Sequence, residues 1–118
     1  MQATIDQTVV TESTIRAVAY EAAQAHQMRH YPNDEFGGCG FAWVNVYPQH
    51  KGNTRLGKAE RRTLESMGFR KSYDGGYQLW NPSGYPTQNI GTLEAGANAA
   101  AALLRDAGFT AYSGSRLD

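Results

Sequence analysis

The sequence predicts an α+β domain, and three observations carry this prediction. Apolar and small residues recur at every third or fourth position over residues 12–30, as on the buried side of a helix. Aromatic, β-branched and small residues fill positions 41–47, as in a strand with two different faces. Residues 64–69 and 104–109 both read Leu-x-x-x-Gly-Phe, which is typical of a helix that ends at a glycine and turns into a strand.

Length and composition indicate one small domain. The 118 residues carry no net charge, with 11 Lys and Arg against 11 Asp and Glu. A chain with so few large aliphatic residues would be disordered at high net charge, but at zero net charge we expect it to fold around its alanines and aromatic rings. The lone Cys39 excludes an internal disulfide, and no long apolar segment is present, so we expect a cytoplasmic protein with no membrane partner.

The N-terminal part is expected to hold one helix. Residues 1–10 have no clear period and are expected to be flexible. A helix is expected over residues 11–30, with a threonine or serine near its start as N-cap and Pro32 just beyond its end. Residues 37–40 read Gly-Gly-Cys-Gly and are expected to form a flexible hinge.

A strand and a second helix follow. Residues 41–47 are expected to form the strand, and a polar loop then leads to Asn53 or Thr54 as the N-cap of the helix. Gly68 lies where a left-handed C-terminal cap is expected.

A hairpin and a long loop come next. The Asp-Gly-Gly sequence at residues 74–76 predicts a hairpin between short strands at residues 69–73 and 77–80. Residues 81–91 contain Asn-Pro, Ser-Gly and Tyr-Pro steps, so we expect an irregular loop there.

The last helix and strand complete a known order of elements. Thr92 is expected to cap a helix that ends at Gly108, and residues 109–112 are expected to form the final strand. Over residues 41–112 the order is then strand, helix, strand, strand, helix, strand, as in the ferredoxin-like βαββαβ sheet. The sequence therefore predicts a single domain, residues 1–118, in which a ferredoxin-like sheet follows an extra N-terminal helix.

Aromatic side chains are predicted to share one face of this sheet. Alternation along the first strand separates its rings from its valines, and the hairpin adds two more rings. We expect this face to be covered by the N-terminal helix, by a second copy of the chain or by another protein, because so many exposed rings are unusual in a monomer. The candidate binding residues are Phe41, Trp43, Tyr47, Tyr77 and Trp80.

Nucleic acid is the alternative partner for this face. An open sheet of this kind can stack bases on its rings while nearby cations hold the backbone. Residues 43–45 and 76–80 fall on the first and third strands of the sheet, where RNA recognition motifs place their aromatic residues, so the chain partly resembles that family. Asp74 and Gln78 depart from the family's pattern of a basic residue followed by Gly-aromatic-Gly/Ala-aromatic-Val.

A basic segment offers a candidate anion site. Residues 51–71 hold seven Lys and Arg against two Glu. Backbone amides at the start of the second helix, together with these cations, would suit a phosphate. A solvated helix face is the favoured alternative, because the glycine and lysine spacing of a Walker motif is missing. The candidate anion-binding residues are Lys51, Asn53, Thr54, Arg55, Lys58 and Arg62.

Catalytic or metal chemistry is the third hypothesis. Cys39 would need a histidine beside it to act as a nucleophile, and the sequence spacing does not demand one. His26 and His30 are four residues apart on a helix and would need Asp34 or Glu35 to complete a metal site. We therefore assign no catalytic residue, no cofactor and no metal, and we expect Cys39 to be a small structural residue.

Three stretches resemble small proteins of tailed bacteriophages. They are Gly-Cys-Gly-Phe-Ala-Trp-Val at residues 38–44, Trp-Asn-Pro-Ser-Gly at residues 80–84 and Ser-Gly-Ser-Arg-Leu-Asp at residues 113–118. The resemblance covers residues 37–118. It implies a phage accessory protein that acts in the host cell cytoplasm, and it implies no activity and no catalytic residue. Together with the aromatic strand, it favours a non-catalytic module that binds itself or a host protein.

Overall fold

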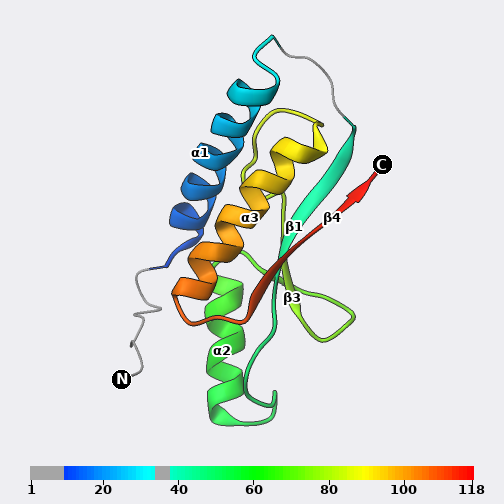
Figure 1. Cartoon of the computed structure of the whole chain (residues 1–118). Coiled ribbons are helices and arrows are strands. Elements are labelled where there is room, and N and C mark those ends of the chain that lie inside the picture. Colours follow the sequence, from blue (N-terminus) through cyan, green and yellow to red (C-terminus); the bar gives the residue numbers. More distant parts are fainter. Residues whose placement is uncertain (1–9, 34–37) are drawn as a thin grey trace.

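Three helices lie on one side of a four-stranded sheet in the computed structural model, which describes residues 10–33 and 38–118 (Figure 1). The predicted α+β class and order of elements are confirmed. From the sequence, residues 1–10 are expected to be flexible. Residues 1–9 are outside the described part of the chain, and Val10 is buried in the core. In chain order the elements are α1 (Glu12–His30), β1 (Gly40–Val46), α2 (Arg55–Ser66), β2 (Arg70–Lys71), β3 (Tyr77–Trp80), α3 (Ile90–Asp106) and β4 (Ala111–Leu117).

The sheet has the strand order β2-β3-β1-β4, and every neighbouring pair is antiparallel. β1 and β3 are therefore the central strands, and β2 and β4 are the edges. The predicted hairpin between β2 and β3 is confirmed, although β2 spans only two residues. β4 is longer than predicted: it continues past Tyr112 to Leu117 because it pairs with β1 along the whole length of that strand.

The core lies between the sheet and the helices. Ala42, Val44 and Val46 on β1 point toward the helices and are at most 1% exposed. The predicted stripe of mostly small residues on α3 is buried against them, which lets the helix approach the sheet closely. This stripe comprises Leu93, Ala97, Ala100, Leu104 and Ala107.

α2 and α3 end in the same way, as the repeated hexapeptide predicts. Gly68 and Gly108 both have a φ of 91°, a left-handed conformation that glycine adopts without strain. The amide of Phe69 donates to the carbonyl of Leu64, and the amide of Phe109 donates to the carbonyl of Leu104. Each glycine amide also donates to a carbonyl three residues earlier, which completes a Schellman motif at both helix ends.

The start of α3 differs from the prediction. Its N-cap is Asn89, and Thr92 lies fully buried in the first turn of the helix. The Thr92 hydroxyl donates to the side-chain carbonyl of Gln27 on α1 at 2.8 Å, so it is used between helices and not as a cap. His26 Nδ1 lies 3.1 Å from the same hydroxyl oxygen.

α1 packs against α3, and α3 lies between α1 and the long strands (Figure 1). Small residues allow this contact: a Cβ at Gly96 would lie 3.1 Å from the carbonyl oxygen of Ala19. The expectation that α1 covers the aromatic side of the sheet is therefore wrong. The small apolar residues of α1 are used for close packing between two helices on the other side.

The segment before β1 is held in place by backbone hydrogen bonds. The amide of Ile90 donates to the carbonyl of Gly38, and the amide of Gly40 donates to the carbonyl of Gln88. Residues 38–40 of the expected hinge are thus hydrogen-bonded to the segment that begins α3. Gly37, the first residue of the expected hinge, lies outside the described residues.

Candidate functional site

The sheet face turned away from the helices carries two groups of aromatic rings, and we call this side of the sheet the aromatic face. The predicted alternation along β1 is confirmed, because Phe41, Trp43 and Tyr47 lie on this side and the valines on the other. Phe41, Trp80 and Tyr112 are 39%, 48% and 56% exposed, so the described chain leaves these rings open to solvent. Ten positions define the face: Phe41, Trp43, Asn45, Tyr47, Arg70, Gln78, Trp80, Tyr112, Gly114 and Arg116.

Trp43 lies at the centre of the aromatic face. Its ring centroid is 4.9 Å from that of Trp80 on β3, with 36° between the ring planes. On its other side, a Cβ added to Gly114 of β4 would lie 2.5 Å from the indole Nε1 and within 2.9 Å of two further ring atoms. The indole therefore lies across β4 at a position that only glycine leaves open.

The orientation of Trp80 is fixed by a chain of hydrogen bonds. Its indole Nε1 donates to the side-chain oxygen of Gln78 at 3.2 Å. The Gln78 amide nitrogen in turn donates to the side-chain oxygen of Asn45 at 3.0 Å. Phe41 meets the edge of Trp80 with 6.2 Å between centroids, so three rings form one preorganised surface over the two central strands.

Two arginines lie on the aromatic face. Arg116 on β4 places its guanidinium 5.5 Å from the ring centroid of Phe41, a cation–π contact. Arg70 pairs with Gln78 and so lies on the same face at the opposite edge of the sheet. None of the ten positions that define the face is acidic. Arginines therefore flank the rings on both outer strands.

One carboxylate borders this face at the tip of the hairpin. The Tyr47 hydroxyl donates to Asp74 at 3.2 Å, and burial together with this bond raises the pKa of Tyr47. Hydrogen bonds from the Ser72 hydroxyl and the Gly76 amide lower the pKa of Asp74. Asp74 is thus engaged in holding the turn and the Tyr47 ring.

Tyr77 does not belong to the aromatic face, which corrects the sequence prediction. It pairs with Val46 and is 4% exposed, whereas Trp80 three residues later lies on the open side. An odd number of residues separates opposite faces of a strand, so two aromatic residues at that spacing cannot share one face.

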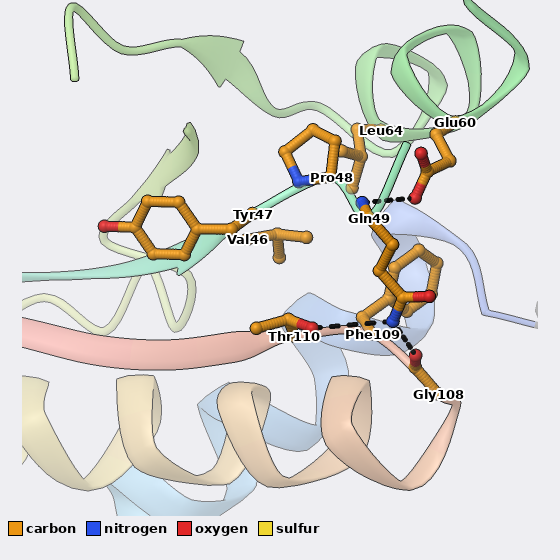
Figure 2. A pocket seen from close by; sticks show the side chains of 9 residues that line it. All are labelled: Val46, Tyr47, Pro48, Gln49, Glu60, Leu64, Gly108, Phe109 and Thr110. Carbon is orange, nitrogen blue, oxygen red and sulfur yellow. Dashed lines mark hydrogen bonds between the residues drawn. The ribbon is translucent and has the colours of Figure 1, made fainter. Parts of the chain in front are cut away.

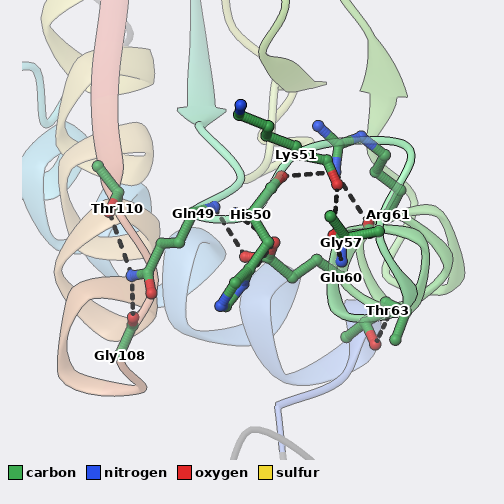
Figure 3. Close-up of polar contacts among 11 residues, drawn as sticks. Gln49, His50, Lys51, Gly57, Glu60, Arg61, Thr63, Gly108 and Thr110 are labelled. Carbon is green, nitrogen blue, oxygen red and sulfur yellow. Dashed lines mark hydrogen bonds and ion pairs between the residues drawn. The ribbon is translucent and has the colours of Figure 1, made fainter.

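Polar groups of the chain contact one another at the start of α2, where the anion site is predicted (Figure 3). Thr54 is the N-cap of α2, as predicted: its hydroxyl accepts from the Gly57 amide at 3.0 Å and donates to the Lys51 carbonyl at 2.6 Å. Arg61 donates to the carbonyls of His50 and Gly57, which fastens the loop onto the first helical turn. Lys51, Asn53, Thr54, Arg55, Lys58 and Arg62 are all exposed, as on a solvated helix face.

A small pocket lies where the end of β1 meets α2 (Figure 2). Gln49 crosses it, donating from its side chain to the Gly108 carbonyl at 3.3 Å, while its backbone amide donates to Glu60 at 2.8 Å. The cavity measures about 10 Å³, enough for about one water molecule. This pocket is therefore a packing gap and not a site for a ligand.

Among the described residues, no histidine is hydrogen-bonded to Cys39. The thiol is half-buried, and its hydrogen bond goes to the Gln88 side chain, with 3.6 Å between the two atoms. The rings of His26 and His30 lie together, with 4.4 Å between centroids, but the acidic residues 34 and 35 lie outside the described residues. Within residues 10–33 and 38–118, no group of three His, Cys, Asp or Glu side chains is arranged to hold a metal.

Sequence reasoning missed the contribution of β4 to the aromatic face. Tyr112, Gly114 and Arg116 alternate with Ser113 and Ser115, which is a strand pattern. The pattern was hidden because the polar, glycine-containing stretch after Tyr112 also fits a C-terminal tail.

Comparisons with known proteins give no relative: no family model matches, and neither the curated proteins nor the solved structures give a match. Of the helices in the described part of the chain, none combines the length and the apolar character needed to cross a membrane.

Proposed function

We propose that this protein is a non-catalytic binding module whose aromatic face holds single-stranded nucleic acid. One observation carries the proposal: solvent-exposed rings on the two central strands lie between arginines on the two edge strands, and the acidic residues near the face, Asp74 and Asp118, lie only at its ends.

The rings suit bases. Trp43 and Trp80 are held in fixed orientations by Gly114 and Gln78, so little conformational freedom would be lost when a base stacks on them. Stacking on an aromatic side chain contributes about 1–3 kcal/mol per base and tolerates any base. A sequence-tolerant platform for two or three bases follows from this arrangement.

The cations suit the phosphates. A single-stranded nucleic acid that crosses the sheet from β2 to β4 would pass Arg70, the rings of β3 and β1, and then Arg116. Each neutralised phosphate releases counterions, so binding should weaken as salt concentration rises. The rings would thus hold the bases, and the arginines would hold the phosphates.

The topology also supports this use of the sheet. We assign the core to the ferredoxin-like βαββαβ class on the strand order β2-β3-β1-β4, the antiparallel pairing and the placement of the helices on one side. RNA-binding modules with a four-stranded sheet stack bases on the rings of their central strands. The resemblance to proteins of tailed bacteriophages suggests that the module acts in the cytoplasm of an infected cell.

A protein partner is the second candidate for the same face. Rings of Phe41, Trp80 and Tyr112 that are 39–56% exposed also form the kind of patch that marks protein interfaces. Arg70 and Arg116 on this face favour a partner surface that is both acidic and apolar.

Titration with a labelled ten-nucleotide oligo(dT) tests the proposal. Wild type should bind with an affinity that falls as salt rises, and Trp43→Ala should weaken binding by about tenfold or more with an unchanged circular dichroism spectrum. Tyr20→Ala is the matched control, since this exposed tyrosine lies on α1. Absence of binding by wild type at low salt, or full binding by Trp43→Ala, contradicts the proposal; stoichiometric capture of an acidic protein would then support the second candidate.

A further inference from the structure

We infer that a second copy of this chain pairs with the free edge of β4, joining two sheets into one continuous sheet with both aromatic faces on the same side. This inference concerns the sheet edge and does not depend on what the aromatic face binds.

The free edge of β4 can be read from its pairing with β1. The Tyr47 amide donates to the Thr110 carbonyl, and the Asp118 amide donates to the Cys39 carbonyl. Hydrogen-bonded pairs alternate along an antiparallel ladder, so the even-numbered residues of β4 turn their backbone groups toward β1. The odd-numbered residues Ala111, Ser113, Ser115 and Leu117 turn theirs outward.

Among the described residues, no strand pairs with this edge. β4 is seven residues long and contains neither proline nor lysine, and its last six residues are at least partly exposed. At the start of β4, the Arg105 guanidinium donates to the outward carbonyl of Ala111 at 3.0 Å. β4 has no proline to block its outward amides, and its one charged residue, Arg116, lies on the aromatic face, so this edge can pair with another strand.

The sequence of β4 complements itself. When two copies run antiparallel with Gly114 opposite Gly114, Ser113 of one copy faces Ser115 of the other, and each of these pairs exchanges two backbone hydrogen bonds. Tyr112 then faces Arg116 of the other copy on the aromatic face. Because the pairing is symmetric, this contact between a ring and a cation forms twice in the interface. This complementarity favours a second copy over an unrelated peptide.

The side toward the helices fits the same register. A polar groove of about 320 Å³ lies between α3 and β4, lined by Glu94, Asn98 and residues 113–115. Ser113 donates to Asn98 and Ser115 donates to Glu94. In the antiparallel dimer, Ser113 of one copy faces Ser115 of the other. The Asn98 end of the groove in one copy therefore meets the Glu94 end of the groove in the other copy, and the Asn98 amide approaches the Glu94 carboxylate.

Sedimentation equilibrium over a wide range of protein concentration tests the inference. Wild type should form a concentration-dependent dimer, and Ser115→Pro should stay monomeric at the same concentrations, because the proline removes an outward amide that β1 does not use. Ser115→Ala is the matched control: it loses the bond to Glu94 but keeps the amide, so it should still dimerise. A monomeric wild type, or a Ser115→Pro variant that dimerises as wild type does, overturns the inference.

A second pair of variants tests the register and covers the case in which Ser115→Pro fails to fold. Tyr112→Lys should raise the dimer dissociation constant by about tenfold, since it places a lysine opposite Arg116 in both copies, and Tyr112→Glu should lower that constant. Tyr112 is 56% exposed, so both changes are compatible with the folded monomer. Equal dissociation constants for the two variants would overturn the proposed register.

Discussion

The indole of Trp43 lies across Gly114 of the neighbouring strand, so close that a Cβ on Gly114 would approach the indole nitrogen to 2.5 Å. The position of the central ring of the aromatic face is thus set by a missing side chain on another strand. The sequence points to Trp43 but not to Gly114, and their relationship exists only in the paired sheet.

Gly114→Ala should displace this indole. We expect a loss of about 1–3 kcal/mol in unfolding free energy from overpacking, a shift in tryptophan fluorescence and weaker oligonucleotide binding. Gly52→Ala is a matched control, because a Cβ there comes no closer than 3.4 Å to Arg61. Unchanged fluorescence in Gly114→Ala would show that the ring lies elsewhere in solution.

Tyr77→Ala and Trp80→Ala should have different effects on stability and binding, because the two residues lie on opposite faces of the sheet. Tyr77 is buried toward the helices, so its loss should lower the unfolding free energy by about 3 kcal/mol or more. Trp80 is 48% exposed, and its loss should cost about 1 kcal/mol in stability while weakening oligonucleotide binding about tenfold. Urea titrations and binding titrations of both variants check this, and the opposite pattern would reverse the assignment of faces.

Gly68→Ala and Gly108→Ala should each lower the unfolding free energy by about 1 kcal/mol, because alanine is strained at a φ of 91°. The two helix ends are separate, so the double variant should lose about the sum. Asparagine, which tolerates the left-handed region better, should cost less than alanine at Gly108, whereas at Gly68 any Cβ also approaches the Glu12 carboxylate to 2.6 Å. Urea denaturation measures all of these, and an unchanged midpoint for both single variants would contradict the paired Schellman motifs.

Stability should fall as pH falls below about 6.5. Burial, and then the nearby charge of His30, lowers the pKa of His26 below its ordinary value of 6.5. The unfolded chain therefore takes up a proton at a higher pH than the native chain, so stability is complete above 6.5 and is lost as pH falls through the lowered native pKa. Thermal melts of wild type and His26→Gln check this: the variant should lose the dependence in that window, and an equal slope would exclude His26 as its source.

Local patterns in the sequence determined most of the elements. The period of residues 12–30 placed α1, and the repeated Leu-x-x-x-Gly-Phe placed two helix ends, because a glycine cap and an apolar strand start are encoded within six residues. The Asp-Gly-Gly turn placed the hairpin, and the alternation in β1 separated its valines from its rings. Each of these features depends on neighbours in sequence alone.

Tertiary structure decided which surfaces remain open. α1 packs on α3 and leaves the rings exposed. Thr92 donates its hydrogen bond to the Gln27 side chain and does not cap the helix. The polar segment after Tyr112 forms an edge strand because it can pair with β1 along the whole length of that strand. Pairing then brings Arg116 and Gly114 beside Phe41 and Trp43, more than seventy residues away in the sequence. Such contacts depend on which faces meet when the whole chain is packed, and that is a property of the assembled layers, not of any one segment.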